Sequence, residues 1–186
     1  MPDYTIDPGV SRFTVRGFAG GMLSALGHNP VVGIRDFHGD VQYDPGSPEK
    51  ASLRITIPAA SLEIQNNASE KDRREMKRVM HEEVLETAHY PDIAFGSTGA
   101  KMNGSGSAEI EGNLTLHGVT RPVRIAARVS VIGDMLRANG EFTILQSDYR
   151  IKPVSVAGGT LKLKDELKLA FDIAARQKSG NVTAAG

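Results

Sequence analysis

Apolar and polar residues alternate along most of the chain, and the alternation is strictest between residues 110 and 131. Apolar side chains occupy every second position on both sides of His117-Gly118. A period of two places them on one face of a β-strand and the polar side chains on the other. Glycine adopts positive φ without steric cost, so His117-Gly118 is predicted to form the turn. The segment therefore predicts a β-hairpin of strongly fixed register, with Leu114 and Val123 facing inward.

The same period of two recurs in shorter segments. It predicts further strands at residues 10–17, 31–43, 53–57, 92–99, 136–146 and 167–173, with Tyr149 and Ile151 extending a strand. The apolar positions change phase within residues 31–43, so a bulge or bend is expected between Gly33 and Asp36. About eight alternating strands at short spacing favour an antiparallel barrel or sandwich, and the pattern alone does not separate the two.

Residues 69–85 have helical rather than strand periodicity. Ser69 can cap the N-terminus, and apolar residues such as Met76 and Met80 recur at helical spacing on an otherwise charged surface. We expect an amphipathic helix with a solvated charged face. The length of 186 residues fits one domain, predicted at residues 1–177. Residues 178–186 are small and polar and are predicted to form a disordered tail.

Composition excludes several classes of protein. With 22 basic and 22 acidic residues the formal net charge is zero, so no electrostatic footprint for nucleic acid is visible. Cysteine is absent, which excludes disulfides and thiolate zinc sites. No apolar run reaches about 18 residues, so we expect no transmembrane helix and no integral membrane contact. The N-terminus lacks a signal-peptide pattern, which predicts a cytoplasmic protein, or a periplasmic or secreted one if a signal was removed. The sequence leaves a homodimer open.

Three segments carry more specific signatures. Residues 112–123 read Gly-Asn-Leu-Thr-Leu-His-Gly-Val-Thr-Arg-Pro-Val, residues 90–97 read Tyr-Pro-Asp-Ile-Ala-Phe-Gly-Ser, and residues 4–8 read Tyr-Thr-Ile-Asp-Pro. Together they resemble the YceI family of lipocalin-like polyisoprenoid-binding proteins, and the resemblance spans residues 4–176. It implies an all-β fold, an eight-stranded antiparallel lipocalin-like barrel with one α-helix near one end. A barrel of that size is just wide enough to hold one slender ligand.

The barrel interior is the functional surface that the resemblance implies. It favours non-catalytic binding of an extended lipid, such as a polyisoprenoid or a fatty-acid-like chain, because aliphatic walls suit a flexible hydrocarbon without directional contacts. We expect a hydrophobic lipid-like partner, no nucleic acid, no cofactor and no metal. The candidate ligand-binding residues are Phe13, Val15, Met22, Leu26, His28, Leu114, Val123, Ile125, Phe142, Leu169 and Phe171.

Two other functions stay open at the level of sequence. Neither a Gly-x-Ser-x-Gly nucleophile motif nor a His-Glu-x-x-His zinc motif occurs. The first alternative is a small metal-dependent hydrolase that uses His28, His81 and His89. The second is a barrel filled by its own side chains that serves as a stress-related interaction module.

Residues 18–30 combine flexible glycines, apolar side chains and one histidine. Glycine lowers the cost of moving the segment and methionine adapts to varied hydrocarbon shapes, so the segment is predicted either to gate a barrel opening or to plug it permanently. If the ligand carries a phosphate, the candidate basic contacts are Arg16, Arg35 and Lys152.

Overall fold

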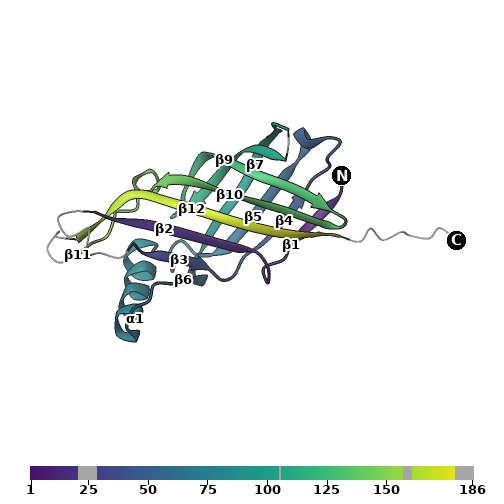
Figure 1. The fold of residues 1–186 in the computed structure, drawn as a ribbon. Coiled ribbons are helices and arrows are strands. Elements are labelled where there is room, and N and C mark those ends of the chain that lie inside the picture. The colour runs from purple at the N-terminus through teal and green to yellow at the C-terminus, as the bar shows by residue number, and fades with distance from the viewer. Residues whose placement is uncertain (21–28, 105, 157–160, 179–186) are drawn as a thin grey trace.

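The strands wrap into an antiparallel barrel with a helix at one end (Figure 1). The structure, a computed structural model, describes residues 1–20, 29–104, 106–156 and 161–178. Its strands are β1 (Asp3–Ile6), β2 (Arg12–Gly20), β3 (Val31–Ile34), β4 (His38–Gln42), β5 (Ser52–Pro58), β6 (Leu62–Ile64), β7 (Asp92–Met102), β8 (Ser107–Leu116), β9 (Val119–Ile132), β10 (Met135–Leu145), β11 (Ser155–Val156) and β12 (Leu161–Gln177). The helical elements in these ranges are α1 (Glu70–Val79), the π-helical turn η3 (Met80–Val84) and the 3-10 turns η1 (Pro48–Lys50), η2 (Ala59–Ser61) and η4 (Gln146–Tyr149).

Strand pairing closes the barrel. The order is β1-β4-β5-β7-β8-β9-β10-β12, and β12 pairs back with β1. Three barrel positions are each filled by two consecutive short strands: β1 with β2 along one edge of β12, then β3 with β4, then β5 with β6. Together with β7, β8, β9, β10 and β12 these make eight positions, which confirms the predicted eight-stranded barrel.

The breaks between the short strands have local causes. Between β1 and β2, Ser11 maintains the contact with β12, because its hydroxyl accepts a hydrogen bond from Ala174 N–H at 2.9 Å and donates one to Ala174 C=O at 3.2 Å. β3 ends at Ile34 and β4 begins at His38, where pairing passes from β2 to β1. The bend predicted at residues 33–36 is therefore confirmed.

The predicted hairpin is formed by β8 and β9. Leu116 pairs with Val119, and His117 and Gly118 between them have φ of 50° and 70°. Two successive positive φ values characterise the type I′ turn, whose twist matches that of the flanking strands. A side chain at Gly118 would also collide with Tyr90, since an added Cβ would lie 2.6 Å from its ring. Glycine is thus required here for both conformation and space.

The segment after β10 differs from its prediction. Tyr149 and Ile151 do not extend a strand: Tyr149 ends the 3-10 turn η4, and Arg150 after it has a φ of 59°. Asp165 on β12 stabilises this turn, because its carboxylate accepts hydrogen bonds from Ser147 N–H at 2.8 Å and from the Ser147 hydroxyl at 2.5 Å. The alternation correctly marks both apolar residues as buried, but a contact with a distant strand decides their backbone conformation.

Two apolar clusters form the core of the barrel. The first includes residues of the N-terminal strand β1 and of the strands around it: Tyr4, Ile6, Phe37, Leu136, Ile173 and Ala175. The second lies beneath the β8–β9 turn and η4 and contains Leu114, Leu116, Ile144, Tyr149 and Ile151.

Helix α1 begins as predicted and ends earlier. The Ser69 hydroxyl accepts a hydrogen bond from Asp72 N–H at 3.1 Å, which is the expected N-terminal cap. The α-helix ends at Val79 rather than Leu85, because the chain widens into η3, where Leu85 N–H donates to Met80 C=O at 2.9 Å. This five-residue spacing defines a π-helical turn, a feature often found at functional sites.

In the ranges described above, no helix has the length and apolar character needed to cross a membrane. Lys178, assigned by sequence to the tail, donates its N–H to Asp3 C=O at 2.7 Å and pairs with the Asp40 carboxylate at 2.6 Å. The rest of the expected tail, residues 179–186, lies outside the described residues.

Candidate functional site

A cavity of about 610 Å³ lies inside the barrel. Almost all side chains around it are aliphatic or aromatic, and they come from both apolar clusters, from strands on all sides of the barrel and from α1 with η3. The polar side chains on its wall are those of Thr14, Asp72 and Glu75. The volume falls in the range of small-molecule sites, roughly 300–1,000 Å³. The described residues thus leave space inside the barrel that their own side chains do not fill.

Most of the sequence-predicted ligand residues lie on this wall: Phe13, Val15, Leu114, Ile125, Phe142, Leu169 and Phe171. Val123 faces inward and packs on the second cluster, but lines a separate pocket between β9 and β10. Met22, Leu26 and His28 lie outside the described residues, as does much of the predicted gate at residues 18–30. Contact of any of these residues with a ligand stays a prediction.

Antiparallel register brings the predicted residues together. Phe13 pairs with Phe171, and Leu169 pairs with Phe142 on one side and with Val15 on the other. Residues paired directly across two strands project to the same face of the sheet. Sequence alternation identified the inward face of each strand, and the pairing then places these side chains in one continuous patch of the wall.

Two glycines that sequence analysis did not single out shape the wall. A Cβ at Gly112 would lie 2.4 Å from the Phe95 ring, and one at Gly140 would lie 2.9 Å from the Phe171 ring. Each aromatic ring therefore occupies the space that a side chain at the glycine would need, and both phenylalanines line the cavity. Glycine at an inward strand position, next to an aromatic residue of the neighbouring strand, is the signal that could have revealed this arrangement.

The α1–η3 segment covers one side of the cavity. Met76 and Val79 from α1, and Val84 from η3, contribute apolar side chains to the wall. His81 fixes this segment to the barrel, because its Nε2 lies 3.1 Å from the carbonyl oxygen of Leu62 on β6. The donor is then Nε2–H, and Nδ1 is buried without a hydrogen-bond partner among the described residues. His81 thus occupies the edge of β6 that no strand pairs with in the described structure.

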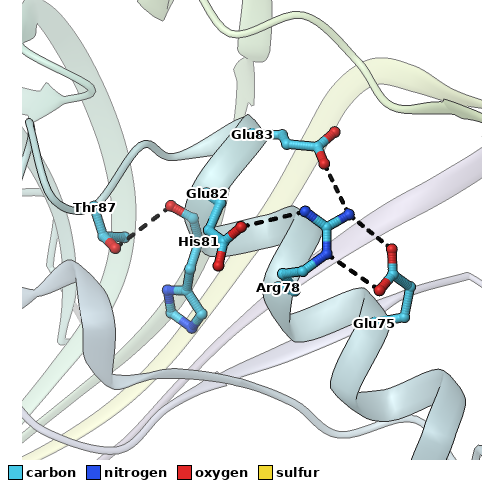
Figure 2. Close-up of polar contacts among 6 residues, drawn as sticks. All are labelled: Glu75, Arg78, His81, Glu82, Glu83 and Thr87. Carbon is cyan, nitrogen blue, oxygen red and sulfur yellow. Dashed lines mark hydrogen bonds and ion pairs between the residues drawn. The ribbon is translucent and has the colours of Figure 1, made fainter.

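Arg78 links α1 to η3 on the exposed side. Figure 2 shows its guanidinium between three carboxylates, at 2.8 Å from Glu75, 3.2 Å from Glu82 and 2.9 Å from Glu83. Hydrogen bonds to these carboxylates, that of Glu75 first, raise the pKa of Arg78. The hydrogen bond from Arg78 in turn lowers the pKa of Glu75. The contacts join residues of the α-helical turn to residues of the π-helical turn.

Arg78→Gln is expected to speed amide hydrogen exchange within η3, since the turn loses its link to α1. The effect is expected to be modest, because exposed ion pairs contribute little. In the wild type, acid should lower the protection factors of η3, which compare exchange with the intrinsic rate at the same pH. A carboxyl whose pKa is lowered on folding stabilises the fold above its unfolded pKa, and that contribution is lost as the pH falls through the lowered value. Arg74→Gln, on the same helix, is the control. Equal exchange in both variants would contradict the link.

The remaining histidines do not gather at one place. His117 Nε2 lies 2.8 Å from the Glu86 carboxylate and its Nδ1 lies 3.1 Å from the Tyr149 carbonyl oxygen, so this ring connects the β8–β9 turn to two other segments. His89 is exposed beside Tyr90. The part of the chain with described side chains contains no group of three residues suited to hold a metal ion. His28 lies outside that part.

Comparison with known proteins identifies a matching family and several similar bacterial proteins. The profile of a family described as YceI-like domain matches residues 4–175. A UPF0312 protein of Azotobacter vinelandii is 35% identical over 165 residues, which cover 88% of this chain and 74% of the relative. One from Pseudomonas syringae pv. tomato is 32% identical over 168 residues, covering 87% and 82% of the two chains.

Solved structures share the fold at low sequence identity. Burkholderia cenocepacia BcnA superposes with a TM-score of 0.76 at 18% identity, over 91% of this chain and 98% of that one. A polyisoprenoid binding domain from Saccharophagus degradans, described as implicated in plant cell wall breakdown, superposes with a TM-score of 0.67 at 12% identity, over 94% and 98% of the two chains. These likenesses establish the architecture around the cavity.

Proposed function

The chain belongs to the YceI-like family, and from its open apolar cavity we propose that it binds one extended lipid chain inside the barrel without chemically changing it. The cavity itself carries the proposal. An apolar chain that leaves water for this wall gains roughly 25 cal/mol per Å² of buried surface, and no directional contact is needed. A polyisoprenoid or a fatty-acid-like chain has the required shape and chemistry.

The Saccharophagus neighbour supports a polyisoprenoid as one ligand class, because its description names that binding activity. The wall chemistry supports binding rather than catalysis, since the polar side chains that the described residues contribute to it are one threonine and two carboxylates. Both carboxylates already have partners on or next to α1. The Asp72 carboxylate accepts a hydrogen bond from the Ser69 hydroxyl at the helix start, and the Glu75 carboxylate pairs with the Arg78 guanidinium. The alternative of a self-filled interaction module is disfavoured by the volume of the cavity.

The direct test is extraction of the purified protein with organic solvent, followed by mass spectrometry. The expected result is a stoichiometric lipid with a long hydrocarbon chain, and delipidated protein that regains binding of farnesol or palmitate in calorimetry. Failure to bind either probe would contradict the proposal. Zinc or iron retained at one equivalent after mild chelation would instead support the metal-dependent hydrolase.

A further inference from the structure

The barrel wall has a gap between β9 and β10 at the end near η4. Pairing of these strands stops at Glu141 opposite Ala126. Each strand nevertheless continues with its other neighbour: β10 pairs with β12 as far as Leu145, and β9 pairs with β8 as far as Val119. Facing backbone edges are thus left without ladder pairing over several residues. Pro122 lies in the gap and has no N–H to donate.

The gap holds a second pocket of about 250 Å³. Its chemistry differs from that of the cavity, because Arg121, Arg124, Thr143 and Asp148 contribute to its lining. Ile144 lines both spaces and is buried, so the same residue borders the cavity and the gap pocket. The polar pocket and the apolar cavity are therefore neighbours.

Tyr149 supplies an unused hydrogen-bonding group to the gap pocket. It is 1% exposed, it lines the pocket, and its hydroxyl has no hydrogen-bond partner among the described residues. A buried hydroxyl without a partner costs free energy, so a ligand atom that accepts its hydrogen bond is favoured there. Burial raises the pKa of Tyr149, the Asp148 carboxylate raises it further and Arg121 opposes the shift. The phenol therefore stays protonated near neutral pH and acts as a donor.

Arg121 keeps donors available for a ligand in the gap. It uses its Nε on the Asp148 carbonyl oxygen at 3.1 Å. A guanidinium has five N–H donors, so Arg121 can still donate to an oxyanion. Arg124 lies on the opposite face of β9 and is turned toward β8, where its Nε lies 3.0 Å from the Glu111 carboxylate. The Asp148 carboxylate partly offsets the positive charge of Arg121. On the α1 side of the cavity, in contrast, the charged wall residues are Asp72 and Glu75.

We propose that the gap between β9 and β10 binds the anionic head group, a phosphate or a carboxylate, of an amphiphile whose chain occupies the cavity. Arg121 donates to the head group together with the Tyr149 hydroxyl, while the chain passes Ile144 into the barrel. The inference rests on the proposed function. It assigns the head group to this gap rather than to the sequence candidates Arg16, Arg35 and Lys152, which do not line the cavity; Arg35, for example, pairs with Glu63 at 2.9 Å.

Calorimetry with two probes of equal chain, farnesol and farnesyl phosphate, separates chain from head group. We expect farnesyl phosphate to bind about tenfold or more tightly than farnesol. The variants Arg121→Gln and Tyr149→Phe should each reduce this preference and leave farnesol binding unchanged. Arg128→Gln, an exposed arginine farther along β9, is the matched control and should retain the full preference. Thermal midpoints verify that each variant is folded.

The outcomes distinguish the two proposals. Equal binding of both probes, or a preference that survives Arg121→Gln, would overturn the head-group site and leave lipid binding intact. Failure of both probes would contradict the proposed function and, with it, this inference. Inorganic phosphate provides a third arm: if it binds alone as tightly as farnesyl phosphate, the gap is a site for the free anion and the amphiphile proposal is wrong.

Discussion

Leu136→Ala is expected to lower the free energy of unfolding by about 2–5 kcal/mol, the range for leucines removed from packed cores. Leu136 is 2% exposed, belongs to the first cluster and does not line the cavity. It pairs with Val131 on one side and Ala175 on the other, so its deletion leaves a void that rigid neighbouring strands cannot fill. Urea unfolding at constant m-value measures the change.

Leu114→Ala is the matched comparison, because it removes the same atoms from the cavity wall. Leu114 is also buried, but part of its surface already faces empty space, so fewer contacts are lost when it is truncated. We expect a destabilisation smaller than that of Leu136→Ala by at least about 1 kcal/mol. Equal costs at the two sites would indicate that the cavity collapses around Leu114, contrary to an open barrel.

Ala138→Phe is expected to weaken binding of long chains by about tenfold or more, because the ring occupies volume that the chain needs. Ala138 lines the cavity and pairs with Ile173 and Val129, on the same face of β10 as Leu136. The existing space accommodates the added ring, so little change in thermal stability is expected.

A chain-length series measures the effect of Ala138→Phe. Short chains should bind the variant nearly as well as the wild type, while affinity for long chains falls, since the ring shortens the cavity. Asn139→Phe is the control, because the neighbouring position on β10 is exposed and places the same ring outside the barrel. Undiminished binding of the longest chain by Ala138→Phe would show that the ligand lies elsewhere.

The sequence by itself determined the inward faces of the main strands. Alternation through residues 110–131 predicted the β8–β9 hairpin, and the phase change at residues 33–36 predicted the break between β3 and β4. These features are local, because a strand repeats every two residues and a slip of one residue would expose its whole apolar face. The family signatures added closure into a barrel, which alternation alone does not specify.

Only the tertiary structure decided which inward side chains pack against one another and which line a cavity. Leu136 and Leu114 have the same alternation, yet Leu136 packs within the first cluster and Leu114 lines a cavity, because the contents of the barrel depend on how strands distant in sequence approach one another. The gap pocket beside Val123 also arises from strand pairing. There β9 still pairs with β8 and β10 still pairs with β12, but β9 and β10 no longer pair with each other. The π-helical turn bonded to β6 through His81 depends on a partner 19 residues away. Periodicity records which side of a strand is apolar, whereas empty space between apolar sides is a property of the assembled barrel.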